Sequence, residues 1–244
     1  MSQKTLRICI LENGVTPDDL IDQFGSYPMM IENWLAPFFP EATFTYLSLV
    51  QGEALPAPQA FDGYILSGSK YSTYERSPWM LALIEFLLQL REERCPVFGI
   101  CFGHQIMADA YGGLNAKSAA GWGVGAQQYE YETPELPGCA AAFVFHQDQV
   151  QQRPPEARRI GGSSHCKNGV LAYSFPAISV QYHPEFTPEY TQALARKFRG
   201  GLLPEAVSLR ALDSIDSLPV DPSPVAKWVA EFFRTHLGTK HGNR

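Results

Sequence analysis

The chain has 244 residues, enough for one α/β domain or two smaller domains. Its 45% hydrophobic and 18% charged residues are typical of a folded globular protein and exclude extensive disorder. With 19 Lys and Arg against 25 Asp and Glu, the net charge of −6 argues against binding to nucleic acid or to an anionic membrane. The basic group Arg153, Arg158 and Arg159 is expected in a solvated loop.

Two further features bear on where the protein works. No apolar run reaches the roughly 18 residues of a membrane-spanning helix, and the N-terminal run stops at Glu12, as a first strand would. The five cysteines are odd in number and widely spaced, so they do not suggest a disulfide framework. We therefore expect reduced thiols and a cytoplasmic protein.

The first half of the chain alternates between strand-like and helical patterns. Strands are expected at 6–11, 42–50, 61–66 and 96–100, and helices at 27–39, 77–90 and 103–111. This alternation predicts an α/β fold with a mostly parallel sheet and helices on both faces.

The second half is richer in strands. These are expected at 121–131, 141–145, 169–175 and 177–182, which predicts a partly antiparallel portion continuous with the same core. A helix is expected at 187–198, a proline-rich linker at 212–224 and an amphipathic helix at 225–237. The predicted organisation is a main domain, 1–211, followed by a linker and C-terminal helix, 212–244.

Cys101 is the candidate nucleophile. It lies in Gly99-Ile-Cys-Phe-Gly103, a G-x-C-x-G pattern between a predicted strand and a predicted helix, which is the layout of a nucleophile elbow with Cys in place of Ser. The flanking glycines relieve crowding at the sharp turn, and the helix N-terminus stabilises a thiolate. The alternative is a small buried core cysteine. Cys9, Cys95, Cys139 and Cys166 lack this context and are interpreted as structural.

His183 is the candidate base, because it follows a predicted strand directly and so lies at the sheet edge where α/β proteins place their sites. Glu185 can fold back to orient it; the alternative is a simple helix-start turn. His104 is expected to face away from Cys101 or to pack locally, and His146 and His165 are expected in loops. The pairs Cys101-x-x-His104 and His165-Cys166 have poor spacing for one ion, so no metal site is predicted.

Taken together, these motifs resemble the class I glutamine amidotransferases of the Cys-His-Glu type. Gly99-Ile-Cys-Phe-Gly-His-Gln105 is similar to the family's nucleophile motif and Tyr182-His-Pro-Glu185 to its His/Glu motif, and the resemblance covers about residues 5–200. It implies a flavodoxin-like fold, with Cys101 as nucleophile, His183 as base and acid, and Glu185 as the residue that orients His183.

The resemblance also implies an oxyanion hole and a substrate site. One donor would be the backbone N–H of Phe102, and the other would come from Gly68 or Ser69, where the family usually has two glycines. Gln105 matches a position that contacts the glutamine substrate. His146 lies in a segment that borders the substrate.

Further segments resemble the free-standing group related to the amidotransferase domain of GMP synthetase, which includes γ-glutamyl peptide hydrolases. They are 25–28, 67–75 and 121–125. No Walker-type phosphate loop occurs, so no cofactor is predicted. The function expected is hydrolysis of the γ-glutamyl amide of glutamine or of γ-glutamyl peptides and amines through a Cys thioester. Tyr27, Tyr71 and Tyr74 are expected to rim the site for a leaving group larger than ammonia.

Three alternatives remain at the sequence level. The chain could be a glutaminase subunit that supplies ammonia to a separate synthetase partner. It could be a non-catalytic regulatory protein on the same fold, or a Cys hydrolase of the α/β-hydrolase type. The last would place its acid well before a late His, whereas Glu185 follows His183. The partners expected are a small-molecule substrate and either a synthetase or further copies of this chain.

Overall fold

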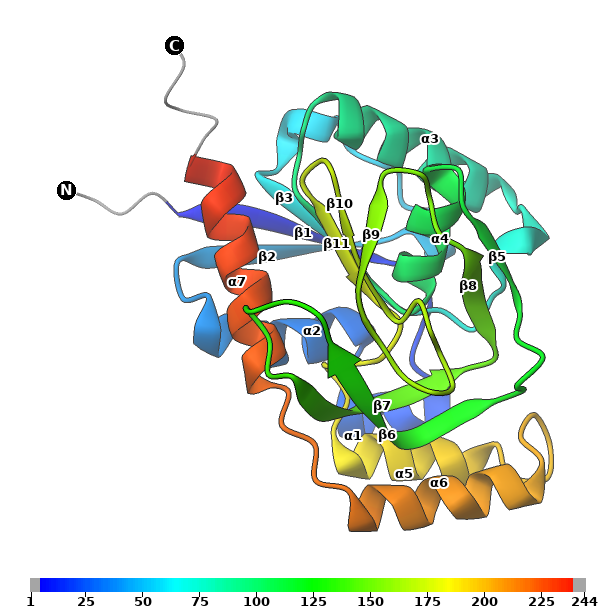
Figure 1. The fold of residues 1–244 in the computed structure, drawn as a ribbon. Coiled ribbons are helices and arrows are strands. Elements are labelled where there is room, and N and C mark those ends of the chain that lie inside the picture. The colour runs from blue at the N-terminus through cyan, green and yellow to red at the C-terminus, as the bar shows by residue number, and fades with distance from the viewer. Residues whose placement is uncertain (1–4, 239–244) are drawn as a thin grey trace.

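The computed structural model describes residues 5–238, so the outer ends of the two predicted units lie outside it (Figure 1). Within this range nine strands form one sheet in the order β2-β1-β3-β4-β11-β10-β9-β6-β7. In that order they are Ala42–Ser48, Leu6–Glu12, Gly63–Leu66, Val97–Ile100, Ala177–Val180, Val170–Tyr173, Ala157–Gly162, Gly123–Tyr131 and Cys139–His146. Strands β5 (Leu114–Lys117) and β8 (Asp148–Gln152) form a separate antiparallel pair.

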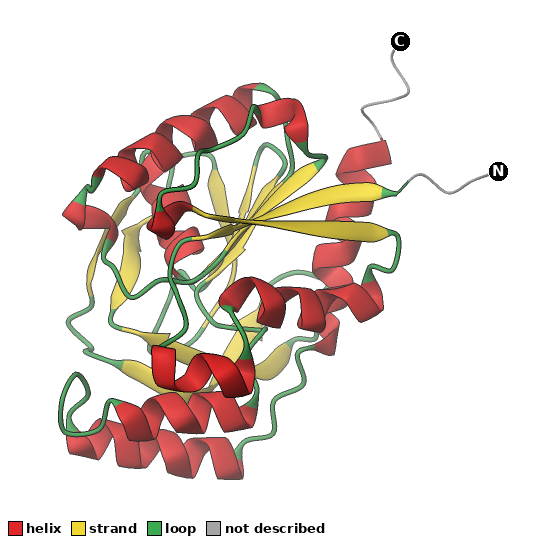
Figure 2. Cartoon of the chain, turned by 180° about the vertical axis from the view of Figure 1, so that it is seen from behind, coloured by secondary structure: helices red, strands yellow, loops and turns green. Residues whose placement is uncertain are grey.

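The five strands from β2 to β11 pair in parallel and are covered on both faces. Because side chains alternate along a strand, Ile8 and Ile10 of β1 enter one apolar cluster while Cys9 and Leu11 enter another. The first cluster is closed by α2 (Tyr27–Leu35) and α7 (Ser223–Gly238), the second by α3 (Pro78–Glu92) and α4 (Phe102–Ala110). Figure 2 shows the layers from behind. Strands β3 and β4 are buried at every position, which explains why they are continuously apolar, whereas the edge strand β2 is mostly half-buried or exposed.

Beyond β11 every strand pair is antiparallel. Helices α5 (Pro188–Lys197) and α6 (Glu205–Ser217) lie side by side beneath β6 and β7 (Figure 1). Helix α6 approaches β6 closely at Gly125, where φ is +94° and a Cβ would lie 2.8 Å from Ala211 Cα, so only glycine fits there. Shorter elements are α1 (Asp18–Phe24) and 3₁₀ turns at Ala36–Phe38, Leu49–Gln51, Pro58–Ala60 and Thr73–Glu75.

The structure confirms the predicted fold class: a mostly parallel sheet with helices on both faces and a partly antiparallel portion. The predicted linker at 212–224 is wrong over 212–217, which belongs to α6; only 218–222 connects α6 to α7. Ala211 and Ile215 bury one face of α6, and this helical spacing outweighs the Ser and Asp content of the segment.

The predicted loop around the basic group is also wrong in part. Arg158 and Arg159 lie in β9, where Arg159 pairs with Glu132. Helix α1 and strands β5, β8 and β9 were not expected from the sequence. None of the helices within 5–238 is long and apolar enough to cross a membrane.

Candidate active site

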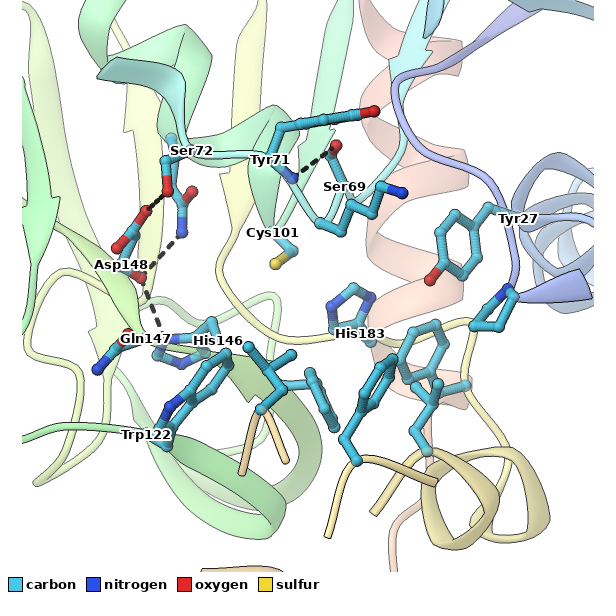
Figure 3. Close-up of a pocket in the computed structure, with 18 of the residues that line it drawn as sticks. Tyr27, Ser69, Tyr71, Ser72, Cys101, Trp122, His146, Gln147, Asp148 and His183 are labelled. Atoms are coloured by element: carbon cyan, nitrogen blue, oxygen red, sulfur yellow. Dashed lines mark hydrogen bonds between the residues drawn. The ribbon is translucent and has the colours of Figure 1, made fainter. Parts of the chain in front are cut away.

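Three neighbouring parallel strands, β3, β4 and β11, end at the same edge of the sheet and carry the candidate site. Loop 67–72 follows β3, Cys101 follows β4, and segment 181–186 follows β11. A cavity of about 290 Å³ opens at this edge, and Cys101 and His183 both line it (Figure 3). The carboxyl edge of a parallel sheet is the usual ligand site of such folds.

Cys101 occupies a sharp turn between β4 and α4. Its φ of 51° and ψ of −101° are unusual for a residue with a Cβ. A Cβ at Gly99 would lie 2.7 Å from the carbonyl carbon of Gly103, and one at Gly103 would lie 2.6 Å from Leu66 O. The two glycines of the G-x-C-x-G pattern therefore allow the turn to close against itself and against β3.

The thiol of Cys101 is buried, with 4% of the residue exposed. Gln181 donates a hydrogen bond from Nε2 to Sγ at 3.6 Å, and Cys101 lies close enough to His183 for their charges to interact. Phe102 is the first residue of α4, so its N–H belongs to the set of helix N-terminal amides that have no partner inside the helix. This end of the helix favours negative charge.

The imidazole of His183 is bound to Glu185 through a hydrogen bond of 2.8 Å from Nδ1 to Oε1, and both residues are buried. Burial alone would lower the pKa of His183, but the charges of Glu185 and Cys101 oppose it and raise the pKa to about 10. The ring also stacks on Phe186, with centroids 3.9 Å apart and planes 9° apart. These contacts favour the protonated ring and fix its orientation.

Loop 67–72 reaches the same place. A Cβ on Gly68 would lie 2.7 Å from Cε1 of His183 and 3.7 Å from Cβ of Cys101. The loop is tied to the end of β1, because Asn13 donates from N to Ser67 Oγ at 2.9 Å and from Nδ2 to Ser67 O at 3.1 Å. Ser69, which stands where the family usually has a second glycine, lines the cavity.

Polar groups gather around Asp148. Its carbonyl accepts hydrogen bonds from Gln105 Nε2 at 2.9 Å and from His146 Nδ1 at 3.2 Å, and its carboxylate accepts one from Ser72 Oγ at 2.6 Å. Lys117 is paired with Asp148 across the β5–β8 ladder and also lines the cavity. Burial lowers the pKa of His146 to about 3, with His165 and His183 adding to the effect, so this ring is neutral and its unpartnered Nε2 is an acceptor.

Apart from Lys70, Tyr71 and Gln147, the rest of the lining is apolar and mostly aromatic. It comes from the segment before α1, the start of α2, the entry to β6, the end of β7, the segment before α5, and helix α5 with the loop that follows it. The residues are Val15, Pro17, Tyr27, Trp122, Phe145, Phe186, Leu194, Phe198 and Leu202.

The structure brings most of the sequence-predicted site residues to one cavity. Cys101, His183, Gln105, His146 and Ser69 line it, Glu185 holds His183, and Gly68 abuts both Cys101 and His183. The side chain of Phe102 instead packs on Trp79, with ring centroids 5.5 Å apart, so only its backbone faces the turn.

Among the expected rim residues, Tyr27 and Tyr71 line the cavity. Tyr74 is not among the lining residues, and its hydroxyl lies 3.4 Å from Oδ1 of Asp148. Segment 25–28 does not follow a strand: Gly25 and Ser26 connect α1 to α2, and Tyr27 is the first residue of α2.

Three functional candidates escaped the sequence analysis: Gln181, Phe186 and Asp148. Their closeness in sequence to recognised motifs was a signal, but it does not assign a role to any of them. Gln181 stands two residues before His183, and in extended chain such residues share a face. Phe186 directly follows the Tyr182–Glu185 motif, and Asp148 stands two residues after His146.

The remaining histidines and cysteines have structural surroundings. His104 is buried, with Nδ1 2.8 Å from Ser179 Oγ, and burial lowers its pKa to about 3, in agreement with the expected local packing. Cys9, Cys95 and Cys166 are buried, Cys139 is exposed, and none of the four forms a disulfide bond within residues 5–238. Within residues 5–238 no three His, Cys, Asp or Glu side chains are grouped so that they could hold a metal ion.

Known proteins resemble the chain along most of its length. The family model "Glutamine amidotransferase class-I" matches residues 20–199. Gamma-glutamyl peptidase 3 of Arabidopsis thaliana is 27% identical over 140 residues, 53% of this chain and 56% of the relative, so the chain spans about half of that relative's length. A glutamine-hydrolyzing GMP synthase subunit of Methanopyrus kandleri is 27% identical over 199 residues, 73% of this chain and 95% of the relative.

Solved structures share the fold. A glutamine amidotransferase from Methylobacillus flagellatus superposes with a TM-score of 0.74 at 21% identity, covering 97% of this chain and 95% of that one. A glutamine amidotransferase from Thermotoga maritima gives 0.70 at 18% identity, covering 95% and 99%. The family match spans well over half of the residues and agrees with the fold, and the chain therefore belongs to the class I glutamine amidotransferases.

Proposed function

We propose that this protein hydrolyses the γ-glutamyl amide bond of glutamine or of γ-glutamyl peptides and amines through a thioester on Cys101. The observation that carries the proposal is the arrangement of Cys101, His183 and Glu185 in one cavity. His183 lines the cavity together with Cys101 and is held by Glu185 at 2.8 Å. A nucleophile, a base and a group that orients the base are the parts that covalent acyl transfer needs.

In the first half of the reaction, the Cys101 thiolate attacks the γ-carbonyl carbon and His183 holds the thiol proton. The carbonyl oxygen becomes an oxyanion that the Phe102 N–H and an N–H of Gly68 or Ser69 would stabilise. The C–N bond then breaks, His183 gives its proton to the departing amine, and a γ-glutamyl thioester remains.

In the second half, His183 takes a proton from water as the water oxygen attacks the thioester carbonyl. The C–S bond breaks, the free thiol is restored by the same proton, and glutamate leaves. Glu185 keeps the Nδ1–H of His183 occupied, so that Nε2 is the nitrogen that exchanges protons in both halves. The sum is amide plus water giving glutamate plus amine.

Two observations favour a free-standing hydrolase. Several relatives are named gamma-glutamyl peptidases, one of them aligned over 190 residues, 77% of its length. The cavity of about 290 Å³ also exceeds what a departing ammonia needs, and Tyr27, Phe186 and residues of helix α5 line it.

A glutaminase subunit serving a synthetase is the second candidate. It is favoured by the likeness to the GMP synthase subunit of Methanopyrus kandleri, which the chain covers almost completely. Such a subunit would be nearly silent alone and active with its partner, because the partner completes the site. The presence of all three triad residue types gives a non-catalytic regulator less support.

The test is a product assay of the purified protein on glutamine, γ-glutamyl dipeptides and γ-glutamyl amines. A glutamine-analogue chloroketone should label Cys101, and Cys101→Ser should fold yet lose nearly all turnover, because a hydroxyl lacks thiolate reactivity. Labelling of Cys166 in place of Cys101 would refute the nucleophile. A protein idle on every peptide and amine, but activated on glutamine by a synthetase, would favour the role of glutaminase subunit.

A further inference from the structure

Several hydrogen-bonding side chains of the cavity lie together on one side of Cys101. Figure 3 shows Ser72 and Asp148 on one side of Cys101, and His183 and Tyr27 on the other. The Asp148 side carries hydrogen-bonding groups, including Gln105 and the acceptor Nε2 of His146. The γ-glutamyl half of any substrate bears an ammonium and a carboxylate, so this side suits it.

The opposite side must receive the leaving amine, because His183 would protonate that amine as the C–N bond breaks. Phe186, which stacks on His183, belongs to an apolar cluster that also contains Tyr27, Leu194 and Phe198. The leaving group would therefore depart along an aromatic and aliphatic wall. Ammonia gains nothing from such a wall.

The apolar lining also extends to the Asp148 side of the cavity, where Figure 3 shows Trp122 beside His146 and Gln147. Phe145 contacts both Trp122 and Phe198, with ring centroids 5.9 and 5.8 Å apart, and these three rings are only partly buried. Leu202, in the loop after α5, lines the cavity although it is 54% exposed. A cavity of this size and composition resembles a site for an organic ligand, with a few polar groups at one end.

We propose, on the basis of the function proposed above, that the preferred substrates are γ-glutamyl amides whose amine half carries an aromatic or large aliphatic side chain. The ring or branched chain lies against Phe198 and Leu202 while the scissile carbonyl lies at Cys101. Burying it removes apolar surface from water on both partners, which a glycine or ammonia leaving group cannot do.

The first experiment compares kcat/KM for γ-glutamyl-phenylalanine and γ-glutamyl-glycine, which differ only in the side chain of the leaving amino acid. The expected preference for phenylalanine is about tenfold or more, the scale of hydrophobic-pocket discrimination. γ-Glutamyl-phenethylamide, which lacks the carboxylate, should retain the preference over γ-glutamyl-glycine. Equal rates for phenylalanine and glycine would overturn the proposal while leaving the hydrolase function intact.

Variants of the lining residues then test where the apolar side chain of the substrate binds. Leu202→Ser should lower kcat/KM for γ-glutamyl-phenylalanine several-fold relative to that for γ-glutamyl-glycine. Leu209→Ser is the matched control, because Leu209 is 47% exposed and does not line the cavity. Phe198→Ala should act like Leu202→Ser but more strongly. If Leu202→Ser behaves like the control, the proposed wall is wrong.

A binding measurement keeps the proposal testable even if no turnover is found. Calorimetry on the Cys101→Ala protein should show γ-glutamyl-phenylalanine binding about tenfold more tightly than γ-glutamyl-glycine, with a more negative heat-capacity change. Tighter binding without turnover in the unmodified protein would sink the hydrolase function alone. Equal affinity for the two dipeptides would sink this proposal, whatever the apolar lining then binds.

Discussion

The imidazole of His183 is held on three sides. Glu185 accepts from Nδ1, Phe186 covers one face of the ring, and Gly68 leaves no free space against Cε1. Each contact acts on a different property: Glu185 on the tautomer and charge, Phe186 on the tilt of the ring, and Gly68 on its distance from the loop. The three can therefore be separated by substitution.

The first prediction concerns Glu185. Glu185→Gln removes the negative charge but keeps a hydrogen-bonding side chain, so it should lower kcat less than His183→Ala, which removes the proton carrier itself. Loss of an acid–base group typically lowers the rate about 10²–10⁴-fold. Steady-state kinetics on one γ-glutamyl substrate measure both variants. Near-full activity in His183→Ala, with loss of activity in His146→Ala, would require the roles to be exchanged.

A second prediction concerns Phe186, a positioning residue. A cation over an aromatic face is stabilised, so Phe186→Leu should lower the pKa of His183 and move the limb of the pH–kcat/KM profile that reports it downward by roughly one pH unit. Phe186→Tyr keeps the stacked ring and should restore the profile. Identical profiles for the leucine and tyrosine variants would mean that Phe186 only fills space.

At the residue scale, the sequence identified the candidates that carry a chemical motif. Cys101, His183 and Glu185 are marked by reactive side chains beside strand ends. Phe186 and Gln181 carry no such mark. A phenylalanine after His-Pro-Glu looks like any core residue, and its stacking on His183 depends on the path of the backbone between the two residues. Residues that act through geometry require coordinates.

At the element scale, adjacent strands bring the site together. Strands β3, β4 and β11 are neighbours in the sheet although β4 and β11 are separated by some 75 residues of sequence, so each contributes one loop to the same edge. The β3 loop has the least freedom, because its Gly68 meets both the candidate base and the candidate nucleophile.

A third prediction follows for this loop. Gly68→Ala places a methyl group within 2.7 Å of His183 Cε1, so the ring or the loop must move. Misplacement on this scale can lower kcat/KM about 10²-fold while the melting temperature changes little. Gly138→Ala is the control, because a Cβ there meets nothing within 4 Å. Unchanged kinetics in Gly68→Ala would show that the loop adapts freely.

Helices and strands were predictable where burial of one or both faces produces a regular spacing or a continuous run of apolar residues. The buried parallel strands and helix α3 follow directly from their apolar runs. In the second half of α6, by contrast, Ser and Asp residues and the prolines that follow favour a linker, although Ala211 and Ile215 have helical spacing. Strand β9 was missed for a related reason. Its arginines are polar, but backbone pairing to β10 does not depend on them.

At the scale of the whole molecule, burial of histidines between the sheet and its helices makes the stability of the fold depend on pH. His104 lies on α4 in the buried interior, against Ser179 of β11, and burial lowers its pKa to about 3. In the unfolded chain the same ring has a pKa near 6.5. Between these values the unfolded state holds a proton that the folded state does not, so the free energy of unfolding falls as the pH is lowered through this window.

The fourth prediction is that His104→Asn weakens this pH dependence. Urea unfolding at pH 7, 6, 5 and 4 gives the slope of the unfolding free energy against pH, which measures the difference in bound protons. Between pH 6 and 4 the slope for the variant should correspond to about one fewer proton taken up on unfolding, even if the variant is less stable at pH 7. Parallel curves for the two proteins would contradict a neutral buried His104.

At Cys101 the backbone conformation that lowers the stability of the fold is also the one that presents the thiol at the cavity. A φ of 51° with a ψ of −101° is a backbone state that side chains resist, at a cost of about 1–3 kcal/mol. Glycine ordinarily lowers stability relative to alanine, yet here Cys101→Gly should melt at a higher temperature than Cys101→Ala. Selection for thermal robustness alone would therefore favour glycine at position 101. The proposed thioester chemistry needs a thiol at this position, so the strain of the turn is the loss of stability that this chemistry would carry.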